Sequence, residues 1–79
     1  MQYIRDLLNK IKWDKNKKPE DYSIAYFDRV LNKKNEIRFL DIKRIEGNFM
    51  VVENLGQESH IPLHRIRQVK NKGIIVWQR

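Results

Sequence analysis

The sequence predicts an α+β domain, in which an N-terminal helix packs on a curled antiparallel sheet of about five strands that could close into a small barrel. Apolar residues near the start recur with helical spacing, and later segments are rich in strand-forming residues. Turn residues separate those segments by only a few positions, which favours antiparallel neighbours. With 79 residues the chain has room for one core, so we expect a single domain over 1–79.

The helix is expected over residues 2–12. Its apolar side chains lie three and four positions apart, at Tyr3, Ile4, Leu7, Leu8 and Ile11. Charged and polar residues fall on the opposite side. A helix with one apolar stripe docks that stripe on a sheet, so these five residues are predicted to be core.

A polar loop should follow the helix, because Asn16 and Pro19 break the helical pattern among several lysines. The segment 22–30 is rich in aromatic and β-branched residues and predicts the first strand. Apolar groups fall on both faces of this segment. That pattern is typical of a central strand, here one that turns polar only at its end.

Four further strands are predicted over 37–45, 49–54, 64–69 and 74–79. The connections between the five strands are predicted at 31–36, 46–48, 55–59 and 70–73. Glycine in two of these turns tolerates the positive φ that tight hairpins require. Pro62 has no amide hydrogen to donate, so it should precede a strand or lie on a sheet edge.

The formal net charge is +7, and it is unevenly distributed. Residues 1–20 carry six basic and three acidic side chains, 21–57 carry six of each, and 58–79 carry five and one. The basic excess therefore lies towards the two ends of the chain. If both ends reach one face, they form a positive patch suited to phosphate. The alternative is a set of surface lysines that keeps a small protein in solution.

Several classes of protein are excluded by what the chain lacks. It has no cysteine, which excludes disulfides and cysteine-based zinc sites and permits a reducing, cytoplasmic location. No apolar run approaches the roughly 18–20 residues that span a bilayer, so no membrane partner is expected. Asp6 and Lys10 interrupt the apolar start, which is unlike a signal peptide. The oligomeric state stays open.

No cofactor, metal or catalytic residue is predicted. His60 and His64 would lie some 13 Å apart on one strand, and zinc catalysis needs about three protein ligands. A two-histidine phosphoesterase would need histidines from two strands, each beside a hydroxyl residue. Here both histidines lie in one segment, and the chain has no threonine.

The candidate binding residues are those that suit a phosphate and a base. Arginine binds phosphate through a fork of planar donors, and four arginines fall at or within the predicted strands: Arg29, Arg65, Arg67 and Arg79. Trp77 could stack on a base or pack in the core, and the same alternatives hold for Trp13.

Three further polar residues have two readings each. His64 could contact an anion or make a structural hydrogen bond. In a regular strand the side chains of His64 and Arg65 would point to opposite faces of the sheet. Both could then serve one site only where the strand ends or bends. Asp14 and Asp28 could orient the arginines or cap turns.

Four segments then occur in a recognisable order: "RDLLNKIKWD" at 5–14, "DYSIAYFDR" at 21–29, "IPLHRI" at 61–66 and "GIIVWQR" at 73–79. Together they resemble a small, mostly archaeal family of uncharacterised proteins, later proposed to be an RNA cyclic-group end recognition domain. The family pattern is a helix ending in Ile-x-Trp-Asp, then Tyr-x-Asp-Arg, Ile-Pro-x-His-Arg-Ile and a closing Trp-x-Arg. The match spans essentially the whole chain, with one weak departure at Gln78, where a charged residue is expected.

The resemblance implies a non-catalytic module that binds RNA ends carrying a 2′,3′-cyclic phosphate, in the company of RNA-processing or RNA-repair enzymes. The RNA partner would be a 3′ end or single-stranded terminus. Carried over position by position, the family's polar residues are Asp14, Asp28, Arg29, His64, Arg65 and Arg79, and its aromatic residues are Trp13, Tyr26 and Trp77.

In this hypothesis Arg29, Arg65 and Arg79 contact the phosphate, and His64 donates a hydrogen bond to it. Trp77 or Tyr26 stacks on the terminal base. One alternative is a phosphoesterase that acts on the cyclic end with His64 as general acid or base. The other is a protein-interaction adaptor whose arginines pair with Asp14 and Asp28.

Overall fold

The computed structural model describes residues 3–79, apart from the side chain of Asn54. Its helix and strands are α1 (Ile4–Trp13), β1 (Tyr22–Asp28), β2 (Lys33–Arg38), β3 (Ile42–Glu46), β4 (Phe49–Asn54), β5 (Gln57–Pro62), β6 (Ile66–Asn71) and β7 (Ile74–Gln78). Short 3-10 turns lie at Pro19–Asp21, Phe39–Asp41 and Leu63–Arg65. The α+β class is therefore consistent with the prediction.

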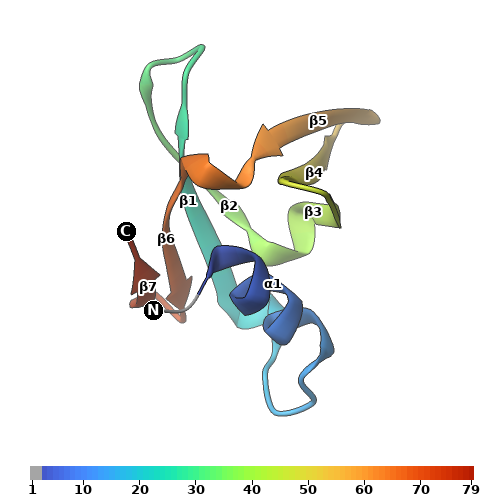
Figure 1. Cartoon of the computed structure of the whole chain (residues 1–79), viewed down its shortest axis with the longest axis vertical. Coiled ribbons are helices and arrows are strands. Elements are labelled where there is room, and N and C mark those ends of the chain that lie inside the picture. The colour runs from blue at the N-terminus through green and yellow to red at the C-terminus, as the bar shows by residue number, and fades with distance from the viewer. Residues whose placement is uncertain (1–2) are drawn as a thin grey trace.

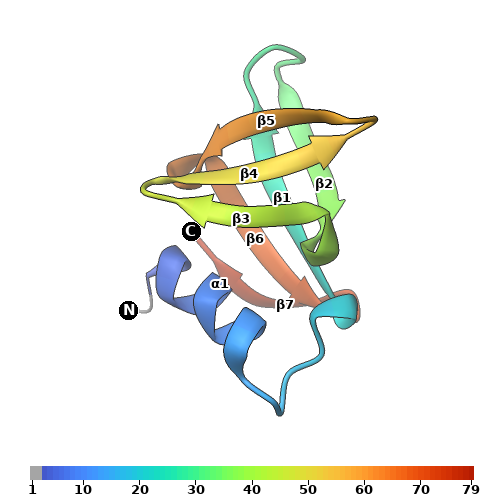
Figure 2. The ribbon, with the colours of Figure 1, turned by 90° about the vertical axis from the view of Figure 1, so that its right-hand side faces the viewer.

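The strands form two antiparallel sheets, in the orders β2-β1-β6-β7 and β3-β4-β5. Figure 1 shows the helix beside these layers, and Figure 2 shows the three-stranded sheet crossing over the four-stranded one, with α1 at one end. Over residues 3–79 the strands do not close into a barrel. The prediction of one curled sheet of five strands is replaced by seven strands in two sheets.

The predicted strand 37–45 is interrupted, which is the main correction to the element order. Residues 37–38 end β2, a 3-10 turn follows, and β3 begins at Ile42. Asp41 holds this turn, because its carboxylate accepts a hydrogen bond from the Arg38 amide at 3.2 Å and pairs with the Arg38 guanidinium at 3.1 Å. Phe39 is buried, so the turn directs the chain from the first sheet into the core and on to the second.

Two edge strands were assigned to loops from the sequence. Residues 33–36, within the predicted loop 31–36, belong to β2, and 57–59, within the predicted turn 55–59, belong to β5. Both strands are mostly exposed and polar, so they lack the apolar alternation that identifies a strand. Pro62 ends β5 at the edge of its sheet, which confirms its predicted position.

Helix α1 begins at Ile4 and ends at Trp13, close to its predicted range; the predicted start at Gln2 lies outside the described residues. It ends because Asp14 adopts extended backbone angles. Four of its predicted core residues are buried: Ile4, Leu7, Leu8 and Ile11. Tyr3 was predicted to be core as well, but it is 74% exposed, because it precedes the helix as its N-cap.

One hydrophobic core joins the helix to both sheets. Leu8 and Ile11 of α1 contact a cluster that includes Ile24 from the four-stranded sheet and Met50 from the three-stranded one. Fully burying a side chain of this size stabilises a fold by about 1.5–3 kcal/mol. Strand β1 lies between β2 and β6, so its prediction as a central strand is confirmed.

Candidate functional site

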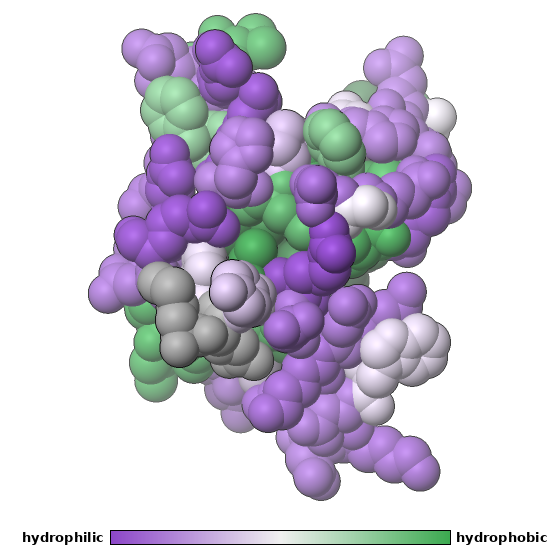
Figure 3. Space-filling view, viewed as in Figure 1, coloured by the Kyte–Doolittle hydropathy of each residue, from purple (hydrophilic) through white to green (hydrophobic). Residues whose placement is uncertain are grey.

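A groove of about 710 Å³ opens where the first turn of α1 faces the end of β7 and the 3-10 turn between β5 and β6. We call it the helix-start groove. Its lining residues are Tyr3, Ile4, Arg5, Asp6, Asn48, Leu63, His64, Trp77 and Arg79. Figure 3 shows this face hollowed in its middle, with hydrophobic residues in the hollow and hydrophilic ones around it. The groove gathers three of the predicted site residues: His64, Trp77 and Arg79.

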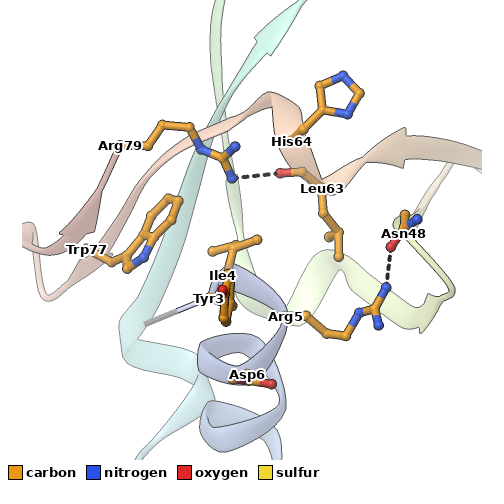
Figure 4. A pocket seen from close by; sticks show the side chains of 9 residues that line it. All are labelled: Tyr3, Ile4, Arg5, Asp6, Asn48, Leu63, His64, Trp77 and Arg79. Carbon is orange, nitrogen blue, oxygen red and sulfur yellow. Dashed lines mark hydrogen bonds between the residues drawn. The ribbon is translucent and has the colours of Figure 1, made fainter. Parts of the chain in front are cut away.

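Strand β7 positions Trp77 and Arg79 on one side of the groove (Figure 4). The Arg79 amide donates to the Arg67 carbonyl at 3.1 Å, which extends the pairing of β6 with β7 to the last residue. The Arg79 guanidinium lies 5.2 Å from the centre of the Trp77 ring and donates through Nη2 to the Leu63 carbonyl at 3.4 Å. These contacts hold the guanidinium, and its Nε and Nη1 make no hydrogen bond to the other residues that the structure describes.

Arg5 lies on the opposite side and ties the helix to the turn between β3 and β4 (Figure 4). Its Nη2 donates to the Gly47 carbonyl at 2.7 Å and to the Asn48 side-chain oxygen. The Asn48 carbonyl in turn accepts from the Leu63 amide at 2.8 Å. Arg5 therefore faces Arg79 across the groove, also with Nε and Nη1 unused by the described residues.

The start of α1 adds backbone donors to the two arginines. The amides of Ile4, Arg5 and Asp6 have no intrahelical partner, and the N-cap residue Tyr3 makes no side-chain hydrogen bond to them. The aligned peptide dipoles also place partial positive charge here. Asp6 is the one acidic lining residue, against two arginines. The groove thus combines anion-binding groups with the apolar side chains of Ile4 and Leu63.

His64 and Arg65 do not lie in a strand, as the predicted segment 64–69 required, but in the 3-10 turn Leu63–Arg65. Regular alternation therefore does not apply to them. His64 is exposed at the groove rim, where Figure 4 draws its ring farther out than Leu63. Arg65 is half-buried and does not line the groove, and its Nε is buried without a hydrogen-bond partner among the described residues.

Two other predicted residues also lie away from the groove. Arg29 is exposed at the turn between β1 and β2 and does not line it. Tyr26 belongs to the core, with 9% exposure, and its hydroxyl accepts from the Asn35 side chain at 3.4 Å. The structure therefore does not gather Arg29, Arg65 and Arg79 around this groove.

The two aspartates cap turns. Asp14 accepts from the Asn16 amide at 2.9 Å, just after α1. Asp28 accepts from the amides of Val30 and Leu31 at 2.9 and 3.1 Å, in the turn after β1. This geometry corresponds to the second of the two readings of these residues. Trp13 is 74% exposed, so its side chain is not core.

Sequence reasoning did not single out Tyr3, Arg5 or Asn48 as site residues. Arg5 reads as part of the polar side of a helix, and Asn48 as a turn residue. Only their placement beside Arg79 and His64 gives them significance. The segment "RDLLNKIKWD" did contain Arg5, but nothing in its spacing indicated which polar residue faces the end of the chain.

Metal and membrane features can be assessed over residues 3–79. No group of three or more histidine, aspartate or glutamate side chains there could hold a metal ion. No helix in that range is long and apolar enough to cross a membrane.

Comparison with known proteins gives one family. Residues 1–79 match the model of the MJ1316 RNA cyclic group end recognition domain. A UPF0248 protein of Saccharolobus islandicus is 32% identical over 79 residues, covering 96% of this chain and 98% of its own. A UPF0248 protein of Methanococcus maripaludis is 36% identical over 70 residues, covering 86% and 84%. No solved structure matches the chain significantly.

Proposed function

The chain belongs to the MJ1316 RNA cyclic group end recognition domain family, and from that premise we propose that it binds phosphate-bearing RNA ends in the helix-start groove. The RNA end carries a 2′,3′-cyclic phosphate, and the module is non-catalytic, serving RNA processing or repair in the cytoplasm. The related UPF0248 proteins are archaeal, which fits the family expected from the motifs.

One observation carries the proposal. Residues from two of the four family segments, His64 of "IPLHRI" and Trp77 and Arg79 of "GIIVWQR", line one groove together with Arg5 and the start of α1. A cyclic phosphate carries one negative charge and several acceptor oxygens. Arg5, Arg79 and the amides at the start of α1 line the groove with hydrogen-bond donors and positive charge, which suit a phosphate. His64 adds a donor at the rim.

Tyr3 is the aromatic residue that stacks on the terminal base. It is 74% exposed and lines the groove, so one face of its ring is open to a ligand. Trp77 packs against the core and has the Arg79 guanidinium over its ring, so it serves to hold the arginine in place. Base–aromatic stacking contributes about 1–3 kcal/mol per base.

The test compares three RNA oligomers of one sequence that end in a 2′,3′-cyclic phosphate, a linear 3′-phosphate or a 3′-hydroxyl. We expect both phosphate-bearing ends to bind more tightly than the 3′-hydroxyl, because only a phosphate pairs with the donors of the groove. The family description places the cyclic end above the linear phosphate, although the linear phosphate carries more charge. Equal affinity for all three would exclude end recognition and leave general RNA binding.

The same samples separate the two alternatives. A phosphoesterase would convert the cyclic end to a ring-opened product, which mass spectrometry detects, and the conversion would be lost in His64→Ala. The groove offers only one histidine for such chemistry, since His60 pairs with Glu46 on the other sheet at 3.4 Å. A protein-interaction adaptor would show no affinity for any of the three oligomers at low salt.

A further inference from the structure

A second groove, of about 400 Å³, lies at the opposite end of α1. Lysines from two distant segments line it: Lys17 and Lys18 from the loop after the helix, and Lys72 from the turn between β6 and β7. We call it the lysine groove. In the sequence these lysines fall in a predicted loop and a predicted turn, and nothing in their spacing links them.

Backbone contacts hold the two segments together. The Lys72 amide donates to the Asp21 carbonyl at 2.8 Å, and the Asp21 amide donates to the Lys18 carbonyl at 2.9 Å. Tyr22 pairs with Asn71 where β1 meets β6. The basic excess near the start of the chain thus meets the excess near its end at this groove, as the charge distribution allowed.

The charged residues of the lysine groove favour an anionic ligand that is not held in one fixed orientation. Asp21 is the one acidic lining residue, against three lysines, and its carboxylate reaches Lys72 Nζ only at 4.0 Å. The Lys72 side chain is 73% exposed, so this pair is weak. Lysine acts on phosphate as a mobile point charge, whereas arginine offers a fork. A lysine cluster therefore suits a phosphodiester backbone better than one specific terminal group.

Strand β7 connects the two grooves. Ile74, at its start, lines the lysine groove, and Trp77 and Arg79, at its end, line the helix-start groove. Ile74 and Arg79 are five residue steps apart, which is about 17 Å in an extended chain. The helix α1 runs between the same two grooves, with Arg5 at one and the loop of Lys17 at the other (Figure 2).

We propose that an RNA strand held by its end in the helix-start groove continues along β7, and that the lysine groove binds its internal phosphodiester backbone irrespective of sequence. This inference rests on the proposed function, because it takes the RNA end as the fixed point of the path. The helix-start groove then recognises the chemical group at the RNA end, and the lysine groove adds affinity that depends on RNA length.

The experiment uses two ligands and two matched double variants of the full chain. The ligands are adenosine 2′,3′-cyclic monophosphate and an RNA of about twelve nucleotides with the same end, a length that single-strand-binding folds cover. The test variant is Lys17→Gln/Lys18→Gln. The control is Lys33→Gln/Lys34→Gln, which removes the same charge from β2, the opposite edge of the same sheet from β7.

We expect the test variant to bind the long RNA roughly five- to tenfold more weakly than the control does, the size expected for two exposed charge pairs. The slope of log affinity against log salt should also become shallower by about 1.4, or about 0.7 per phosphate contact. Affinity for the cyclic mononucleotide should be the same in both variants. Lys72→Asn, which suits the positive φ of 52° at this position, should weaken long-RNA binding in the same way.

The outcomes distinguish the two ideas. The three-oligomer comparison above first establishes whether wild type prefers the cyclic end. If it does, but both double variants bind the long RNA equally, the lysine groove is not on the RNA path and the inference is overturned. If wild type shows no preference for the end while the test variant still weakens long-RNA binding, the proposed function fails and the lysine groove remains an RNA-binding surface. Loss of mononucleotide binding in the test variant would also contradict a separate role for this groove.

Discussion

At the scale of single residues, Arg79 makes three contacts. Its amide donates to the Arg67 carbonyl, and its guanidinium lies over the Trp77 ring and donates to the Leu63 carbonyl. Its Nε and Nη1 make no hydrogen bond to the described residues, and Arg79 lines the helix-start groove. Because lysine keeps the charge but loses the fork, Arg79→Lys should weaken binding of the cyclic end about tenfold, by the loss of one hydrogen bond to a charged group. Isothermal titration with the cyclic-ended RNA measures the change.

Arg29→Lys is the matched control for that substitution. Arg29 was predicted as a phosphate contact from the motif "YFDR", but its side chain is exposed at the turn between β1 and β2 and does not line the groove. We therefore expect affinity within about twofold of wild type, because surface changes away from a site alter energies by about 0.5 kcal/mol or less. A tenfold loss in Arg29→Lys would show that the motif, and not the groove, identifies the site.

The sequence could predict which residue types bind phosphate, but only part of their arrangement. His64, Trp77 and Arg79 meet because the 3-10 turn Leu63–Arg65 and the end of β7 lie side by side. Tyr26 illustrates the opposite case, since an aromatic residue in a strand looks the same in sequence whether it stacks on a base or fills the core. Tyr26 is buried because other elements of the fold cover its face of β1, and their position depends on the whole fold.

At the scale of elements, α1 supplies both core residues and one wall of the helix-start groove. Ile11 is fully buried, so Ile11→Ala should lower the free energy of unfolding by about 2–5 kcal/mol, through lost burial and the cavity left behind. Asn9→Ala, on the exposed side of the same helix, should change it by less than about 0.5 kcal/mol. Urea denaturation measures both, and similar losses would contradict the docking of the helix through one stripe.

The three-stranded sheet carries a network of ion pairs on its exposed face. Glu58 on β5 pairs with Lys43 at 2.9 Å and with Arg44 at 3.2 Å, both on β3. The hydrogen bonds from Arg44 and then Lys43 lower the pKa of Glu58 from 4.5 to about 2. Lys43 also pairs with Glu53 at 3.4 Å, so it bridges two carboxylates that face each other across β4 and β5.

This pKa shift gives a pH dependence of stability with a defined sign. A carboxyl group whose pKa is lower in the folded state stabilises the fold above its unfolded value, and the effect is lost as pH falls. The window for Glu58 therefore runs from about 4.5 down to about 2. Thermal unfolding midpoints of Glu58→Gln should fall less steeply across that window than those of wild type. Parallel declines would contradict the network, and Glu20→Gln, in an exposed turn position, is the control.

Element boundaries were predictable where the sequence pattern reflects burial. Helix α1 and strands β1 and β4 carry enough buried apolar residues to be recognised, and they were found nearly in place. Strands β2 and β5 are polar strands at the edges of their sheets. Backbone hydrogen bonds hold them in place, and such bonds cannot be recognised from the pattern of side chains. The turn at Phe39–Asp41 was missed because a buried Phe39 looks like a strand residue.

At the scale of the whole molecule, the helix and the last strand bring the two basic ends of the chain to shared grooves. Sequence alone could count those charges but could not place them, since their meeting depends on β7 and the turn before it lying beside α1 and the loop that follows α1. The overall result is one groove with arginines and helix amides and another with lysines. RNA affinity should accordingly fall as salt rises, because each phosphate contact releases counterions.

The most direct test of the central claim is where a cyclic phosphate binds. Adenosine 2′,3′-cyclic monophosphate, titrated into ¹⁵N-labelled protein, should shift the amide signals of Ile4, Arg5 and Asp6 and the side-chain signals of Trp77 and Arg79. The signals of residues near Arg29 should stay in place. Shifts confined to the turn between β1 and β2, or no shifts at saturating ligand, would contradict the assignment of the helix-start groove as the site of RNA end recognition.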